Sequence, residues 1–99
     1  MEENCHVEPI HKTATADQVM KAERALLTIW GMGCPNCATR VRNSLLALDG
    51  VYAADVYLNM GVAEVRFDKQ KISAPLLVEA VSRAGNDVGH EYRAELMTA

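Results

Sequence analysis

Two cysteines, Cys34 and Cys37, stand three positions apart in the stretch GMGCPNC, residues 31 to 37. Thiols at this spacing can act as a redox switch, as half of a four-ligand zinc site, or as a complete two-thiolate site for a soft metal ion. The spacing does not choose among these three chemistries. The elements that position the thiols must therefore be read from the rest of the sequence.

The cysteines lie where a helix is expected to begin. Pro35 fits the first position of a helix, because its missing N–H would have no partner there. Cys34 is then placed at about the N-cap and Cys37 two positions after Pro35. Unpaired backbone N–H groups and the positive end of the helix dipole stabilise anions at such positions, so we expect both thiols to have a pKa below the roughly 8.5 of a free thiol. Thiolates should be available near neutral pH.

The residues around the thiols favour a soft metal ion. Two thiolates with no third or fourth ligand close by suit Cu(I) better than Zn(II), which prefers four ligands. Gly31 and Gly33 allow the loop to bend and to bring its backbone near a metal, while Met32 is long and apolar and is expected to reach into the core. Such an open site can pass its ion to another pair of thiolates by stepwise ligand exchange.

Three further potential ligands, Cys5, His6 and His11, occur in the first 23 residues, which lack sustained periodicity. We predict that residues 1–23 form a flexible N-terminal extension with a short helix capped by Thr15 or Asp17. The three side chains are either incidental or contribute to the metal site as additional ligands.

The remaining segments alternate between strand and helix patterns. Apolar residues alternate in the segments predicted as strands, which are residues 25–30, 51–59, 62–67 and 87–96. Apolar residues recur every three or four positions in the segments predicted as helices, which are residues 35–48 and 74–84. Gly50 suits a left-handed C-cap for the first helix, and Gly85 is expected to stop the second.

The resulting order, β-α-β-β-α-β, predicts an α+β fold of the ferredoxin-like type. In this fold a four-stranded antiparallel sheet carries two helices on one face. We therefore expect an N-terminal extension over residues 1–23 and one domain over residues 24–99.

The amino-acid composition and net charge limit the classes of function that this chain can have. The 99 residues are 49% hydrophobic and 23% charged, which fits one globular domain. A net charge of −3 argues against nucleic-acid and anionic-membrane binding, and the acidic N-terminus is unlike a signal peptide, so a cytoplasmic protein without direct membrane insertion is expected. Three cysteines in a reducing compartment indicate metal or redox chemistry rather than a disulfide framework. No set of catalytic groups is visible, so we expect no enzyme activity.

With its motif placed between a strand and a helix, the sequence resembles the heavy-metal-associated domain of copper chaperones and of the N-terminal regions of metal-transporting P-type ATPases. Gly31, Met32, Cys34 and Cys37 match the Gly-Met-x-Cys-x-x-Cys pattern of that family. The resemblance covers residues 24–96. It implies that Cys34 and Cys37 are the metal ligands, and that a P-type ATPase or a similar metal-binding domain is the partner.

Two positions depart from patterns common in the family. Many members carry an aromatic residue or a lysine after the Ala-Gly at the end of the second helix, where this chain has Asn86. Members that handle zinc often have Asp before the first cysteine, where Gly33 offers no carboxylate. The second departure favours a monovalent soft ion, and Zn(II), Hg(II) and Cd(II) remain the alternatives.

The sequence therefore predicts a metallochaperone that binds Cu(I) through Cys34 and Cys37 and passes it to a partner. The alternatives are a metal-binding domain excised from a transporter, a zinc, mercury or cadmium handler, and a thiol-disulfide redox module. A homodimer bridged by the metal through four thiolates is also compatible with the motif. The end of the chain at Ala99, directly after the last predicted strand, favours the free-standing protein.

Overall fold

The structure is a computed structural model that describes residue 9 and residues 15–33, 35–86 and 91–97. Its elements in chain order are α1 (Ala16–Lys21), β1 (Glu23–Trp30), α2 (Pro35–Leu46), β2 (Val51–Tyr57), β3 (Val62–Phe67), α3 (Ala74–Asn86) and β4 (Arg93–Leu96). From β1 onward this is the predicted β-α-β-β-α-β order.

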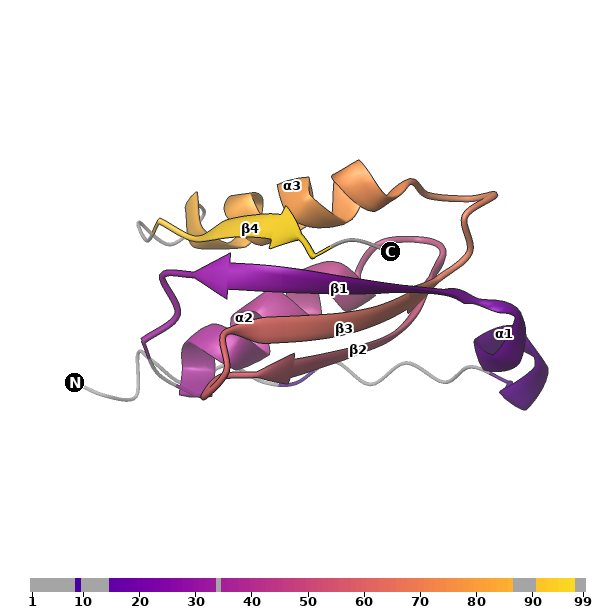
Figure 1. The fold of residues 1–99 in the computed structure, drawn as a ribbon, viewed down its shortest axis with the longest axis horizontal. Helices are drawn as coiled ribbons and strands as arrows, with labels where there is room; N and C mark the ends of the chain where they lie inside the picture. Colours follow the sequence, from indigo (N-terminus) through magenta and orange to yellow (C-terminus); the bar gives the residue numbers. More distant parts are fainter. Residues whose placement is uncertain (1–8, 10–14, 34, 87–90, 98–99) are drawn as a thin grey trace.

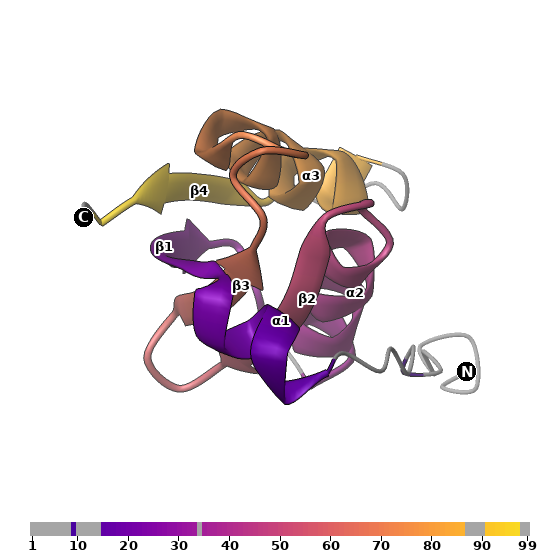
Figure 2. The same cartoon turned by 90° about the vertical axis from the view of Figure 1, so that its right-hand side faces the viewer.

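The strands form one four-stranded antiparallel sheet in the order β2-β3-β1-β4. β1 lies inside the sheet, with Leu27 opposite Ala63 of β3 and Ile29 opposite Ala94 of β4. Both α2 and α3 cover the same face of the sheet, as the two perpendicular views show (Figure 1, Figure 2). The prediction of a ferredoxin-like α+β fold is confirmed.

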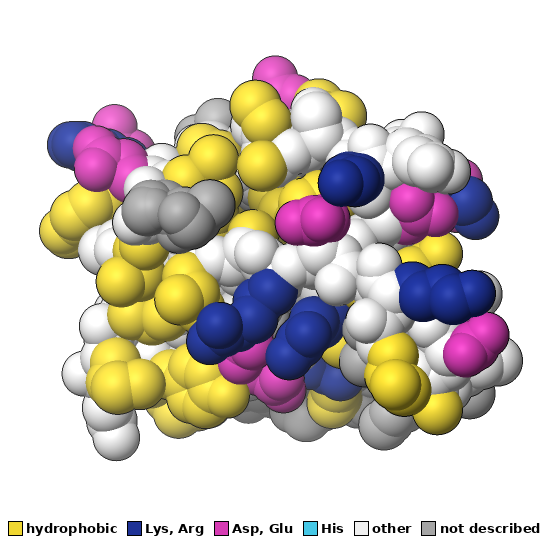
Figure 3. All heavy atoms as spheres, turned by 45° about the vertical axis from the view of Figure 1, so that its right-hand side comes forward, with side chains coloured by type: hydrophobic (Ala, Val, Ile, Leu, Met, Phe, Trp, Pro, Cys, Tyr) yellow, Lys and Arg dark blue, Asp and Glu magenta, His cyan; other side chains and the backbone are white. Residues whose placement is uncertain are grey.

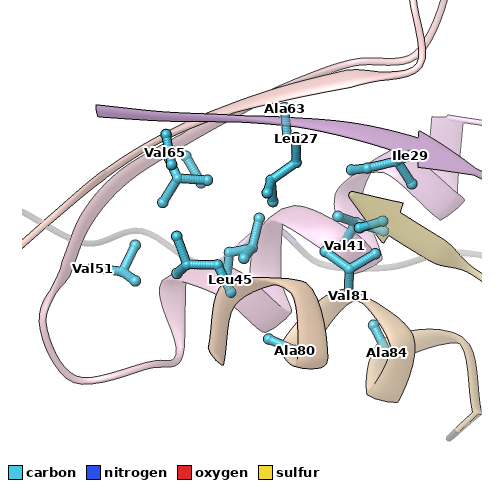
Figure 4. Close-up of a cluster of buried hydrophobic side chains, with 14 of the residues drawn as sticks. Leu27, Ile29, Val41, Leu45, Val51, Ala63, Val65, Ala80, Val81 and Ala84 are labelled. Carbon is cyan, nitrogen blue, oxygen red and sulfur yellow. The ribbon is translucent and has the colours of Figure 1, made fainter. Parts of the chain in front are cut away.

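The core lies between this sheet face and the two helices. Leu27 of β1, Val41 and Leu45 of α2 and Val81 of α3 are completely buried and point toward one another (Figure 4). Burying a Val or Leu side chain of this kind contributes about 1.5–3 kcal/mol to the free energy of unfolding. This packing joins β1 to α2, the two elements on either side of the loop that carries the cysteine motif.

Several element bounds differ from the predicted ones. β1 starts two residues earlier, at Glu23, and β4 is a strand only over residues 93–96, with residues 87–90 lying outside the described part. α3 continues through Gly85 to Asn86, because a single glycine costs a helix interior only about 1 kcal/mol, and the buried Ala84 packs in the core. α2 ends at Leu46, and Gly50, with a φ of +99°, belongs to the turn into β2 rather than to the helix cap.

The short helix predicted in the extension is present as α1, and Thr15 caps it. The backbone N–H of Gln18 donates to Thr15 Oγ1 at 3.1 Å, and the N–H of Thr15 donates to Gln18 Oε1 at 3.0 Å, which is a reciprocal capping box. α1 lies beyond the end of the sheet opposite to the loop between β1 and α2 (Figure 1). Asp17 lies within the first turn of α1 rather than at its cap.

Charged side chains of both signs are mixed on the face that Figure 3 displays. Arg24 of β1 donates to Glu64 of β3, and Lys69 pairs with Glu23 at 3.4 Å. Exposed pairs such as these contribute about 0–1 kcal/mol each to stability, so packing of the core decides the fold. Within the described ranges, the helices are too short or too polar to cross a bilayer.

Candidate metal centre

Cys37 lies in the first turn of α2 and is buried, with 4% of its surface exposed. The helix begins at Pro35, as predicted, and Thr39 Oγ1 donates back to the Pro35 carbonyl at 3.2 Å. The first turn of a helix lies at the positive end of the helix dipole, which favours an anion beside it. The thiol of Cys37 is thus placed where a thiolate is stabilised.

The loop between β1 and α2 packs closely against the segment before β4 at Gly31 but has no close neighbour at Gly33. Gly31 has a φ of +101°, and a Cβ atom at this position would overlap the carbonyl oxygen of Glu91 and lie 3.3 Å from the Cα of Tyr92. Met32 is partly buried and packs against the core, as predicted. Gly33 has no atom within 4 Å of the position that a Cβ would take. The backbone therefore docks at Gly31 and leaves room for a bound ion or a partner near Gly33.

Tyr92 is the residue of this site that the sequence reasoning missed. Its side chain is buried, with 5% exposed, and its hydroxyl group accepts a hydrogen bond from Arg40 Nη1 at 3.2 Å. Burial raises the pKa of Tyr92 above the usual 10.0, and the hydrogen bond that its hydroxyl makes with Cys37 raises this pKa further, whereas Arg40 lowers it. The Tyr92 hydroxyl is thus hydrogen-bonded to two side chains of α2, Arg40 and Cys37.

Strand pairing explains why Tyr92 lies here. Arg93 is paired with Trp30, and its guanidinium group lies 5.0 Å from the centre of the Trp30 ring. A cation above an aromatic ring is attracted to it, so the contact supports the pairing. Since Trp30 precedes Gly31 directly, this register places Tyr92 beside the start of the loop between β1 and α2. The alternation of apolar residues over 87–96 carried no signal for a contact between Tyr92 and α2.

Of the predicted ligands, the structure describes Cys37, whereas Cys34, Cys5, His6 and His11 lie outside the described residues. Among the residues that are described, no three His, Cys, Asp or Glu side chains come together as a metal site. The described part of the candidate centre therefore consists of the buried thiol of Cys37 at the start of α2, together with the side chains of Tyr92 and Arg40. Its pairing with Cys34 remains a prediction from the sequence.

This chain is similar in sequence to copper chaperones of known identity. Residues 26–87 match the heavy-metal-associated domain. The copper chaperone CopZ of Staphylococcus saprophyticus is 39% identical over 62 residues, which cover 63% of this chain and 91% of CopZ. CopZ of Bacillus subtilis is 38% identical over 66 residues, which cover 67% of this chain and 96% of CopZ.

Solved structures agree with these sequence matches. A copper-binding domain of the P-type ATPase HMA7 superposes with a TM-score of 0.69 at 27% identity, covering 76% of this chain and 93% of that domain. The N-terminal domain of a potential copper-translocating P-type ATPase from Bacillus subtilis, solved in its Cu(I)-loaded state, superposes with a TM-score of 0.67 at 31% identity. That alignment covers 76% of this chain and 86% of the ATPase domain.

Proposed function

The chain belongs to the heavy-metal-associated domain family, and on this premise we propose that it is a metallochaperone that binds one Cu(I) ion through Cys34 and Cys37. The matched relatives are copper chaperones and copper-binding domains of ATPases, and the chain is accordingly a metal-binding domain rather than an enzyme. We place this domain at residues 24–99 and treat residues 1–23 as an extension.

The observation that carries the proposal is the buried thiol of Cys37 in the first turn of α2, three positions after Cys34. The family match over residues 26–87 includes both cysteines. Thiolate ligands select Cu(I), which accepts two ligands, and the first turn of the helix offsets the negative charge of the pair. Zn(II), Hg(II) and Cd(II) would accept the same thiolates, but the relatives named here are copper proteins.

The partner that we propose is a P-type ATPase domain or another domain of the same family. Support comes from the structural similarity to ATPase metal-binding domains, because two sites of one kind can exchange a Cu(I) ion thiolate by thiolate. The open side of the loop at Gly33 leaves room for the incoming thiolates. We place this exchange in the cytoplasm.

We infer that Cys5, His6 and His11 are not required for copper binding, since two thiolates complete a Cu(I) site. A Cys5→Ser/His6→Ala/His11→Ala variant should then bind Cu(I) with the affinity and stoichiometry of the wild type. A lost equivalent of copper or a weaker affinity in this variant would assign the extension to the site.

The experiment that tests the proposal is an anaerobic Cu(I) titration of the reduced protein against a chromophoric chelator. We expect one Cu(I) per chain for the wild type and none for the Cys34→Ser/Cys37→Ser variant. One Cu(I) per two chains would indicate the metal-bridged dimer. Equal and weak binding by both proteins would contradict the copper function, and insulin-reductase activity would then identify the redox alternative.

A further inference from the structure

Side chains from two distant parts of the chain, α2 and the segment before β4, meet beside the loop between β1 and α2. Cys37 and Arg40 are one helical turn apart on α2, so they share a face of that helix. Tyr92 reaches the same place from the segment before β4 and is almost fully buried. The thiol of Cys37 therefore has two polar side chains next to it, the Arg40 guanidinium and the Tyr92 hydroxyl, which we call the Arg40–Tyr92 pair.

The hydrogen-bond donors in this group point in one direction. A guanidinium group can only donate, so the bond of 3.2 Å between Arg40 Nη1 and the Tyr92 hydroxyl uses a lone pair of the hydroxyl oxygen. The single proton of the hydroxyl is thereby left for the sulfur of Cys37, with which Tyr92 makes a side-chain hydrogen bond. The chain of donors runs from Arg40 through Tyr92 to the sulfur.

A donor placed in this way acts most strongly on a thiolate. Hydrogen bonds to an ionised acceptor are about twice as strong as those between neutral groups, and a buried bond is screened little by water. Groups that hydrogen-bond to a metal-ligating side chain fix its orientation, and their loss commonly lowers metal affinity by about 10–100-fold. The Arg40–Tyr92 pair has this relation to Cys37.

We propose that Arg40 and Tyr92 are positioning residues of the copper site, with the Tyr92 hydroxyl holding the Cys37 thiolate and Arg40 holding the hydroxyl. This inference rests on the proposed copper function, and it adds a determinant of affinity that lies outside the Cys-x-x-Cys motif. The motif provides the sulfur atoms, whereas the pair keeps one of them in a fixed place while the ion is bound and exchanged.

The test removes only the hydroxyl oxygen, in the Tyr92→Phe variant, and measures Cu(I) affinity by competition with a chromophoric chelator. We expect an affinity about tenfold below that of the wild type and a faster release of copper to excess chelator. Tyr52→Phe is the matched control, since the Tyr52 hydroxyl also donates a hydrogen bond, to Asp68 Oδ2 at 3.3 Å, away from the loop between β1 and α2. This control should keep the affinity of the wild type.

Far-ultraviolet circular dichroism confirms that each variant is folded before titration, so that a loss of affinity is not a loss of structure. If Tyr92→Phe is folded and binds Cu(I) as the wild type does, Tyr92 has a structural role alone and the inference is overturned. The proposed function would survive that result, because it depends on the two cysteines. A wild type that binds no Cu(I) would overturn both.

A double-mutant cycle tests the part assigned to Arg40. Arg40→Met removes every donor and keeps the aliphatic stem, and it should weaken Cu(I) binding in the wild-type background. In the Tyr92→Phe background the same substitution should have little further effect, because the group through which Arg40 acts is already gone. An equal loss in both backgrounds would show that Arg40 acts independently of Tyr92 and would refute the relay.

Discussion

Replacing Gly31 with alanine should destabilise the protein strongly, although the residue lies in an exposed loop. A φ of +101° is unfavourable for any residue with a Cβ atom and costs roughly 1–3 kcal/mol. The added Cβ would also overlap the Glu91 carbonyl oxygen, which is backbone and cannot rotate away. Relieving an overlap of this kind costs roughly 1–3 kcal/mol more. Together the two effects amount to about 2–6 kcal/mol, which is a large part of the roughly 5–15 kcal/mol by which domains are stable.

Gly33→Ala is the matched control, because it makes the same chemical change in the same loop. The Cβ would meet no atom within 4 Å, and Gly33 is not among the glycines with positive φ. We expect its free energy of unfolding to stay within about 0.5 kcal/mol of the wild type. The difference in free energy of unfolding between Gly31→Ala and Gly33→Ala thus measures how much the close packing at Gly31 matters for stability.

The assay is urea denaturation of the metal-free, reduced protein with two probes. Fluorescence of Trp30, the sole tryptophan of the chain, reports on the residue next to Gly31, and far-ultraviolet circular dichroism reports on the whole fold. Two results would show that the contact with Glu91 does not hold the loop. The first is a free energy of unfolding for Gly31→Ala within about 0.5 kcal/mol of the wild-type value, and the second is an equal loss of stability in Gly33→Ala. Where Gly31→Ala is still folded, it should also bind Cu(I) more weakly, because relief of the overlap moves Tyr92 away from Cys37.

Three further predictions concern the core, the contact between the helices and the response to pH. Leu45→Ala should lower the free energy of unfolding by about 3–5 kcal/mol, because Leu45 is completely buried; a smaller loss in urea denaturation would show that the core collapses into the cavity. Ser44→Ala should lower the free energy of unfolding by about 0.5–1.5 kcal/mol, since Ser44 Oγ donates to the Ala80 carbonyl at 2.8 Å and links α2 to α3. An unchanged urea midpoint would show that this hydrogen bond does not contribute to stability. Folding raises the pKa of Tyr92, so its contribution to stability is fully present below pH 10.0 and is lost as the pH rises through the folded-state pKa. Urea denaturation at increasing pH should therefore show a loss of stability above pH 10.0 that is smaller in Tyr92→Phe, and equal losses in both proteins would contradict this origin.

The sequence by itself determined the order of the elements and the place of the cysteine motif between a strand and a helix. Strand alternation and helix periodicity are local patterns, and they predicted β3 at residues 62–67 as observed. The helix start at Pro35 was equally local, because a proline has no N–H to lose there. These features depend on residues close together in the chain, so they can be read without knowing the fold.

Packing decided where the elements end. A glycine within α3 carries a penalty of about 1 kcal/mol, which is a small term against the burial of the apolar face of the helix. α3 therefore continues through Gly85, although local rules predicted that it would stop there. Gly50 has the positive φ expected of it, but it belongs to a turn that the position of β2 requires.

Only the tertiary structure decided what surrounds the thiol. Tyr92 and Arg40 are 52 residues apart, and their contact exists because β4 pairs with β1 in the register that sets Arg93 opposite Trp30. The same register distinguishes Gly31, whose backbone lies against Glu91, from Gly33, which lies in open space. Local patterns predict which residues could be the ligands of a metal site, whereas contacts between distant strands determine which groups surround them.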